Sequence, residues 1–295
     1  MRGSSVGCSG WLGIVASMVW CSPADAQTVP FSDTEDASLG EVTVGDGSWH
    51  PIARFNLRNG DYARGSYDDD SSSLNRIPVH VELGLVYDLK DATAGAGSMW
   101  LELHSSNGVH APSSQETRNP RAWYESNNLV GFVYAPAKGL RAALSYTIKT
   151  SPNDVAATSH EASVALSYQA DRGLGWLHPN VVATIRPKGG HGLYTQLSIE
   201  PEWKLGEADG APSISLPASV GIGWGGFYEA GSRTVSYRSV GLAATRPFMV
   251  GSARWSLRGE VAALIRDRTL ARLDGDDANR ATVVPIGQMT LSLAY

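Results

Sequence analysis

A histidine and a serine stand two residues apart in the segment LELHSSNG, residues 101–108. A serine hydroxyl becomes a nucleophile when an imidazole nitrogen accepts its proton, so His104 and Ser106 together could hydrolyse an ester. The same residues could also form the polar end of a β-strand that runs into a loop. The direction in which His104 points decides between these interpretations, and that direction depends on the surrounding elements.

Long stretches of the chain alternate between apolar and polar residues, which is the pattern of a β-strand with one apolar face. The clearest examples are IPVHVELGLVYDL (77–89), LRAALSYTIK (140–149) and EASVALSYQ (161–169). Strands in soluble proteins usually have about five or six residues, and these runs are about twice as long. They suit tilted strands that cross a bilayer.

Strands in a bilayer must close on themselves, because lipid offers no partner for an unpaired backbone group. We therefore predict an all-β fold: a single closed antiparallel transmembrane β-barrel of about twelve strands. Leu83, Leu144 and Val220 would face the lipid. The strands are expected at residues 49–58, 77–89, 97–106, 127–135, 139–149, 159–169, 178–187, 193–204, 212–224, 234–246, 252–265 and 282–295.

One predicted strand has an irregular pattern. In residues 234–246, Val235 and Tyr237 are out of phase with Val240 and Leu242, and a β-bulge would explain the change. Connections at one end of the predicted barrel are mainly long and those at the other end mainly short, as in bacterial barrels.

The start of the chain is typical of a signal peptide. Arg2 precedes an apolar run, and Ala24-Asp25-Ala26 fits an A-x-A cleavage site, so residues 1–26 are the predicted leader. Residues 27–48 are predicted to be a polar periplasmic lead-in, and residues 49–295 the barrel in the outer membrane.

Both cysteines, Cys8 and Cys21, fall in the predicted leader. Cys21 also allows a lipoprotein site, although the bulky Trp20 before it argues against that interpretation. The predicted mature chain has no disulfide framework and no thiolate metal site. We expect no metal and no cofactor, and the net charge of -5 gives no support for a nucleic-acid partner.

The last strand, in which Met289, Leu291, Leu293 and the terminal Tyr295 alternate with polar residues, resembles that of bacterial outer-membrane β-barrels. The resemblance implies that Tyr295 is part of a signal read by the barrel assembly machinery. The segments WYESNN, LRAALSYTIKTSP and GIGWGGFYEAG also resemble TorF-type porins of proteobacteria.

The segment HSSNG is similar to the His-x-Ser-Asn-Gly segment of outer-membrane phospholipase A and to the matching segment of lipid A 3-O-deacylase. This resemblance implies His104 as general base, Ser106 as nucleophile and a later residue that orients the histidine. At the matching spacing the chain has Arg118, so Asn119 could fill that role only after a loop shift. Alternation also places His104 and Ser106 on the face of Glu102, which is the inner face, whereas those enzymes hold the pair on the outside.

The remaining charged residues of the strands fall on the same inner face. The predicted lumen-lining residues are Arg54, His80, Glu82, Glu102, Arg141, Lys149, Glu161, Arg186, Glu200, Glu202, Arg254, Arg258 and Glu260. Both signs of charge are present, so this set alone predicts no strong ion selectivity.

We expect a non-enzymatic function: a porin-like channel in the outer membrane for passive diffusion of small polar solutes or ions. Its expected partners are outer-membrane lipid, the barrel assembly machinery and small solutes. The second hypothesis is a lipid acyl hydrolase of the phospholipase A or lipid A deacylase type. A plugged structural or adhesive barrel and a soluble β-sandwich are also compatible with the sequence.

Overall fold

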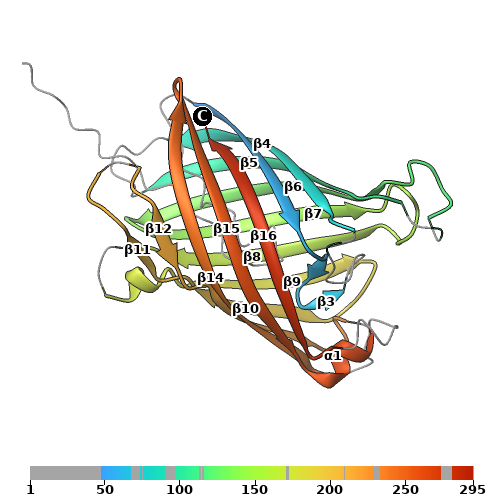
Figure 1. The fold of residues 1–295 in the computed structure, drawn as a ribbon. Coiled ribbons are helices and arrows are strands. Elements are labelled where there is room, and N and C mark those ends of the chain that lie inside the picture. The colour runs from blue at the N-terminus through green and yellow to red at the C-terminus, as the bar shows by residue number, and fades with distance from the viewer. Residues whose placement is uncertain are drawn as a thin grey trace, which may run out of the picture.

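A computed structural model shows the chain as a β-barrel (Figure 1). It describes residues 48–67, 74, 76–90, 97–112, 114, 116–170, 173–208, 210–228, 233–273 and 281–294. The predicted leader, nearly all of the predicted lead-in and Tyr295 lie outside these residues. No helix in the described part of the chain is long and apolar enough to cross a membrane.

The predicted closed antiparallel barrel of twelve strands is confirmed. Its ring closes because β1 pairs with both β4 and β16, while β15 pairs with both β14 and β16. The strands, in their order around the ring, are β1 (Trp49–Arg58), β4 (Val79–Lys90), β5 (Ser98–Val109), β6 (Trp123–Ala137), β7 (Leu140–Thr150), β8 (Ser159–Tyr168), β9 (Asn180–Lys188), β10 (Leu193–Ile199), β13 (Ala218–Trp224), β14 (Val235–Val250), β15 (Ala253–Arg266) and β16 (Val283–Ala294).

Two short strands extend the ring at one end. β11 (Glu202–Lys204) continues β10 after Pro201, and β12 (Ser213–Ser215) leads into β13 past Pro217. Proline cannot donate a ladder hydrogen bond, which explains the two breaks. The carbonyls of both prolines still accept backbone bonds, from Leu216 at 3.1 Å and Gly241 at 2.8 Å, so the wall is continuous there.

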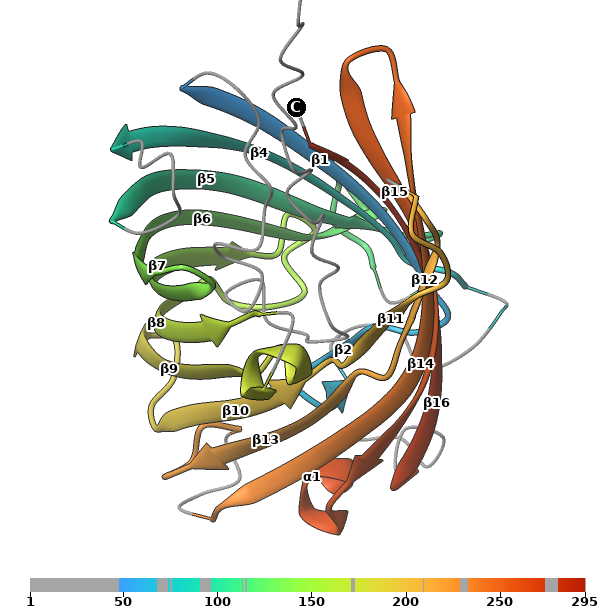
Figure 2. The ribbon, with the colours of Figure 1, turned by 90° about the vertical axis from the view of Figure 1, so that its left-hand side faces the viewer.

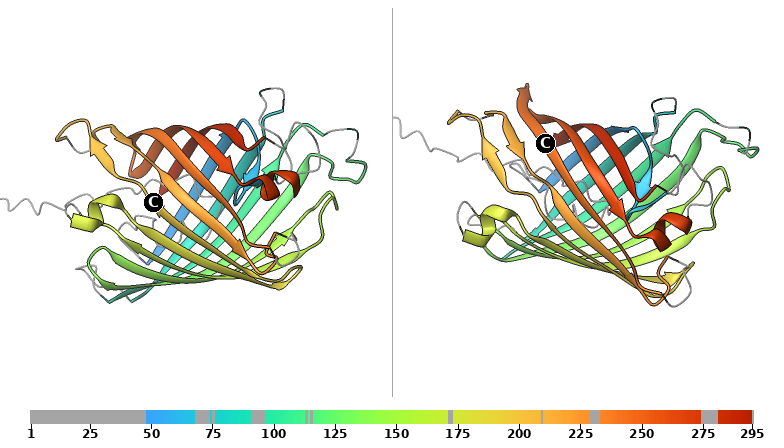
Figure 3. Two further views of the ribbon diagram at one scale, coloured as in Figure 1. Left: turned by 90° about the horizontal axis from the view of Figure 1, so that it is seen from below. Right: turned by 60° about the horizontal axis from the view of Figure 1, so that its bottom comes forward.

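The two ends of the barrel differ. β1 begins where β16 ends, since Ile52 pairs with Ala294, and we call this the turn end because tight connections such as 138–139 and 251–252 lie there. The opposite, loop end holds the longer connections 59–78, 110–122 and 267–282, with helix α1 (Arg268–Leu273) in the last of them. A short 3₁₀ helix, η2 (Gly173–Leu177), lies at the turn end (Figure 3).

The outer surface of the wall is apolar. Leu83 and Leu144 are more than half exposed and Val220 is also exposed, so all three face outward as predicted. Polar residues at alternate positions point inward, and Glu102 beside the exposed Leu103 is buried. Such an arrangement suits a barrel surrounded by lipid, in which the charges lie inside.

Aromatic side chains form rows near both ends of the apolar surface. At the turn end Trp49 packs on Tyr87 with ring centroids 4.4 Å apart, and Phe248 stacks with Trp255 at 6.5 Å. Other outward aromatics are Tyr134, Tyr168 and Trp203 near the turn end and Trp123, Tyr146 and Trp224 toward the loop end. Aromatic girdles of this kind mark the two interfaces of a membrane barrel.

The prediction of a β-bulge in the strand of Val235 and Tyr237 is wrong. β14 pairs with β15 without interruption from Tyr237–Arg266 to Val250–Ala253. Val235 and Tyr237 are apolar and nevertheless point inward, where they belong to a buried cluster. The change of phase therefore marks a place at which the barrel interior is apolar.

Substituting Leu144 by arginine should prevent or weaken insertion into lipid. A basic residue on the lipid face near the midplane costs about 2–4 kcal/mol. Urea titration of the protein folded into vesicles would measure this loss. Val155→Arg, an exposed apolar position in the loop after β7, is the matched control and should cost much less. Equal losses for both variants would contradict the assignment of the outer face.

Candidate functional site: the interior of the barrel

A small hairpin from the first loop-end connection folds into the barrel. It consists of β2 (Tyr62–Ala63) and β3 (Ser66–Tyr67), joined at Arg64 and Gly65 with φ angles of 52° and 78°. A two-residue turn with both φ angles positive is the favoured hairpin turn and requires glycine-like freedom. A Cβ on Gly65 would also lie 2.4 Å from the Tyr237 ring. Figure 2, which views the strands as a ring, shows β2 within its outline.

Arg64 fixes the hairpin to the inner wall. Its two terminal nitrogens each donate a hydrogen bond to one oxygen of Glu161 on β8, both at 2.6 Å, so the pair is bidentate and buried. Arg186 on β9 donates to the same carboxylate at 3.0 Å, and the Lys149 ammonium on β7 lies 3.6 Å away. One carboxylate is therefore shared by three cations from two neighbouring strands and the hairpin.

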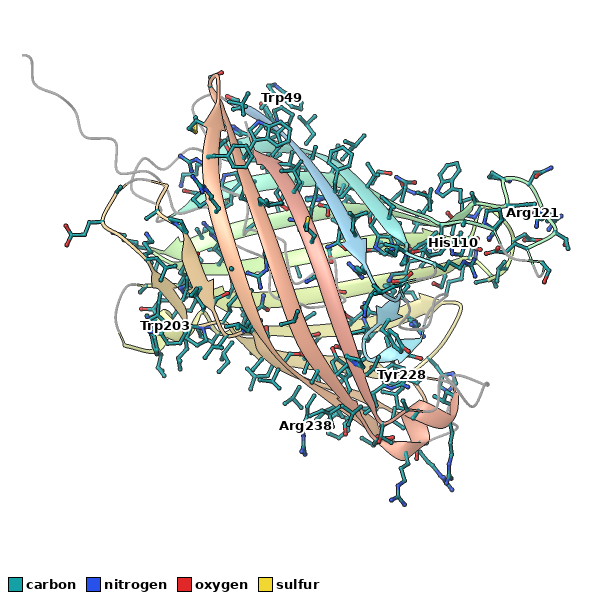
Figure 4. All side chains as sticks on the ribbon, in the orientation of Figure 1. Trp49, His110, Arg121, Trp203, Tyr228 and Arg238 are labelled. Atoms are coloured by element: carbon teal, nitrogen blue, oxygen red, sulfur yellow. The ribbon has the colours of Figure 1, made fainter. Side chains whose placement is uncertain are left out.

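Aromatic rings surround the two arginines. The Arg64 guanidinium lies 5.0 Å from the centre of the Tyr194 ring, and that of Arg186 lies 4.1 Å from the Phe227 ring. The Tyr228 hydroxyl donates to the Arg64 carbonyl at 2.7 Å. Cation–π contacts gain strength when they are shielded from water, so this cluster stabilises the inward position of the hairpin. Figure 4 labels Tyr228 near the loop end of the barrel.

The start of the hairpin is bound to a nearby strand of the wall, because β6 and β8 are separated by β7 alone. Asp61 accepts a hydrogen bond from the Tyr124 hydroxyl of β6 at 2.6 Å and lies 3.7 Å from Arg58. Burial would raise the pKa of Asp61, but the charge and hydrogen bond of His80 and the charge of Arg58 hold that pKa well below its usual range. Asp61 is therefore a carboxylate at neutral pH.

Asp61, His80 and Glu125 also form a group of metal-ligand types. One potential ligand atom of each lies within 4.8 Å of the other two. Imidazole and carboxylate are donors that zinc accepts. The Tyr124 hydroxyl contacts both Asp61 and His80, so existing hydrogen bonds already use these atoms.

His104 lies at mid-height on the inner face of β5. Its Nδ1 contacts Glu82 at 2.8 Å and its Nε2 contacts Glu102 at 3.1 Å, while Arg54 donates to Glu82 at 2.7 Å. A general base needs a ring nitrogen free to accept the serine proton. Both nitrogens of His104 are already held by carboxylates, and this geometry does not provide one for Ser106.

Asn119 does not join His104 in the structure as an orienting residue. It is an exposed residue of the 110–122 connection, beyond the end of β5, whereas Glu82 and Glu102 occupy both sides of the His104 ring. His104 is therefore part of an ion-pair network in the interior, with Glu82, Glu102 and Arg54.

The other predicted lumen residues occupy the remaining inner wall. Near the turn end, Arg258 donates to Glu200 and to Glu260, each at 2.6 Å, so a single cation lies between two carboxylates. Arg141 lies 6.0 Å from the Trp100 ring centre. Arg254 and Glu202 are half-buried on strands of the same end.

Sequence reasoning did not find the hairpin residues that complete the site. Arg64 and Asp61 lie in a segment that reads as a solvated loop, and Phe227 lies in another connection. The apolar inward pair Val235 and Tyr237 could have indicated that a segment packs against this part of the wall, although not which residues that segment contributes.

Comparisons with known proteins find only distant likenesses to solved structures. No family model matches the chain, and no curated protein matches it. Similar solved structures include LpxR from Salmonella typhimurium (11% identity, TM-score 0.45, covering 82% of this chain and 99% of that one). Another is the NanC porin, with 9% identity and a TM-score of 0.41, over 83% of this chain and 98% of that one. A third is a bacterial polysaccharide outer membrane secretin, with 9% identity and a TM-score of 0.45, over 83% of this chain and 97% of that one. At these identities and TM-scores they carry no argument about activity, and the narrower resemblances to TorF-type porins and phospholipase A are not confirmed.

Substituting Glu161 by glutamine should release the hairpin. Removing one partner of a buried ion pair costs about 3–5 kcal/mol, so trypsin cleavage after Arg64 should accelerate by at least about a hundredfold. Mass spectrometry of timed digests would measure that cleavage specifically. Glu260→Gln breaks a comparable buried pair at the turn end and is the control. Cleavage after Arg64 that is equally slow in wild type and Glu161→Gln would contradict the anchoring role.

Proposed function

We propose that the protein is a porin-like channel of a bacterial outer membrane, through which small polar solutes or ions diffuse passively. The observation that carries the proposal is the interior of a closed barrel lined with charged side chains that remain partly accessible to water. Arg54, Lys149 and Arg186 are examples, each on a different strand. A barrel whose interior were a packed core would bury such groups completely.

The outer surface supports a membrane location. Its apolar side chains and its aromatic rows near both ends fit a lipid bilayer with two interfaces. Arg246 also points outward on β14, two residues before Phe248 and on the same face. Its long side chain can therefore reach the interfacial region. The outer membrane is the proposed compartment, with its lipid and the barrel assembly machinery as partners, because a closed β-barrel with an apolar outer surface suits that location.

The hairpin limits which solutes could pass. It reaches from Asp61, bound to Tyr124 on β6, to Arg64, bound to Glu161 on β8, and Gly65 packs on Tyr237 of β14. β6 and β8 are separated by β7 alone, whereas β14 lies across the ring from β6, so the hairpin reaches across the interior. The path for a solute is therefore narrowest at the loop end, which favours small solutes over large ones.

Reconstitution into planar bilayers tests the channel. Wild-type protein is expected to give discrete conductance steps, and Arg64→Ala should give larger steps because the hairpin loses its anchor. Leu174→Ala, at an exposed position of η2, is the control and should match wild type. A wild type without steps would remove the proposal, and steps only in Arg64→Ala would show a closed plug instead.

An esterase assay in detergent tests the hydrolase hypothesis. We expect wild type and Ser106→Ala to show the same background hydrolysis of acyl esters, because both His104 nitrogens are bound to carboxylates. Hydrolysis that disappears in Ser106→Ala and persists in Ser105→Ala would support the lipid acyl hydrolase instead.

A further inference from the structure

Three side chains of metal-ligand type meet inside the barrel at its loop end. Asp61 lies just before β2, His80 on β4 and Glu125 on β6. Nε2 of His80 lies 3.6 Å from an Asp61 oxygen and 3.9 Å from a Glu125 oxygen, and all three atoms are within 4.8 Å of one another. Donor atoms that bind one tetrahedral zinc ion are about 3.3–3.6 Å apart. Movements of roughly 1 Å would therefore close this group around an ion.

A glycine allows the two wall residues to approach each other. β5 separates β4 from β6, and in the register His80 is opposite Gly108, which is opposite Glu125. The outer two backbones are thus about 9–10 Å apart, with the inner face of β5 between them. A Cβ on Gly108 would lie 2.6 Å from the Tyr124 ring. The meeting of these side chains therefore requires a residue without a side chain at position 108.

A β-bulge at the same place turns Tyr124 inward. The register between β5 and β6 skips Tyr124, which is the extra residue of the bulge. Tyr124 is buried, donates a hydrogen bond to Asp61 at 2.6 Å and contacts Nε2 of His80. Bulges often re-aim a side chain beside a functional site. Two departures from a regular strand, Gly108 and the bulge, thus serve one small region.

We infer that Asp61, His80 and Glu125 bind a zinc ion, which fixes the start of the hairpin to β4 and β6. One imidazole with two carboxylates suits zinc, whereas calcium and magnesium take mainly oxygen ligands. The site needs no thiolate, so the lack of cysteine in the predicted mature chain does not oppose it. The His80 and Glu125 side chains are 10% and 18% exposed, so an ion can reach them. The inference goes beyond the proposed channel and does not depend on it.

The other contacts of the two carboxylates are compatible with an ion. A carboxylate has two oxygens and about four lone-pair sites, so one hydrogen bond does not exclude a metal. Arg58 lies 3.7 Å from Oδ1 of Asp61, whereas Oδ2 is the oxygen near His80. Asn127 donates to Oε1 of Glu125, which leaves Oε2 as the oxygen near His80. Such contacts orient a ligating carboxylate from outside.

The contact between His80 and Tyr124 must open when an ion binds. The Tyr124 hydroxyl donates its one proton to Asp61, so its contact with His80 requires a proton on Nε2. A metal-bound nitrogen has no such proton. The ion therefore takes the place of this proton, and the imidazole keeps its other proton on Nδ1. The hydrogen bond from Tyr124 to Asp61 can persist.

Calorimetric titration with zinc chloride tests the site, on protein purified from membranes in detergent without an affinity tag. Wild type is expected to bind zinc. His80→Ala, Asp61→Asn and Glu125→Gln should each weaken this binding by about tenfold or more, since loss of even an outer-shell partner has an effect of that size. Magnesium or calcium at the same concentration should not displace the zinc. Zinc that binds wild type and all three variants equally, or that does not bind at all, would overturn the inference.

Two matched controls accompany the ligand variants. Tyr124→Phe removes the hydroxyl beside the site but no ligand, so zinc binding should persist. Its loss in Tyr124→Phe to the extent seen in His80→Ala would contradict the ligand set. His191→Ala removes an exposed histidine of the connection between β9 and β10 and should match wild type.

Zinc should also protect the hairpin from trypsin. Opening that withdraws Asp61 must release the ion, so zinc at ten times its dissociation constant should slow cleavage after Arg64 by about tenfold in wild type. The same zinc concentration should have no such effect on His80→Ala. Unchanged cleavage in wild type that binds zinc would overturn the fixing of the hairpin. Neither measurement needs conductance, so a failure of the channel proposal would remain distinguishable from a failure of this site.

Discussion

Closure of the hydrogen-bonded ring is the constraint on which the rest of this structure depends. Every wall strand has a partner on both sides, so no row of backbone donors and acceptors is left at an edge. Once the ring is closed, alternate side chains have two different environments. The apolar set covers the outside, and the charged set must find partners within a limited interior, where an unpaired charge would be costly.

The charged side chains inside the barrel find partners by forming local groups of opposite charge. Arg258 lies between Glu200 and Glu260, and His104 lies between Glu82 and Glu102. Glu161 has the reverse surroundings, because Arg64, Lys149 and Arg186 all contact its one carboxylate.

Much of this fold could be predicted from the sequence because a strand in a barrel has only two environments. Alternation located all twelve wall strands and the side on which Leu144 and Glu102 lie. It could not show which inward residues meet, since that depends on the stagger between strands. Lys149, Glu161 and Arg186 were predicted separately, and only the register of β7, β8 and β9 brings them together. Arg64 could not be predicted, because a loop has no periodicity that would indicate its direction.

The central claim is that solutes cross the wild-type barrel, and swelling of proteoliposomes tests it most directly. Vesicles that contain the wild-type protein and an impermeant polymer are diluted into isotonic solutions of small and large neutral sugars. The proposed channel function predicts rapid swelling in a small sugar and slow swelling in a large one, because the hairpin would narrow the passage. Swelling no faster than that of protein-free vesicles in every sugar would contradict the account.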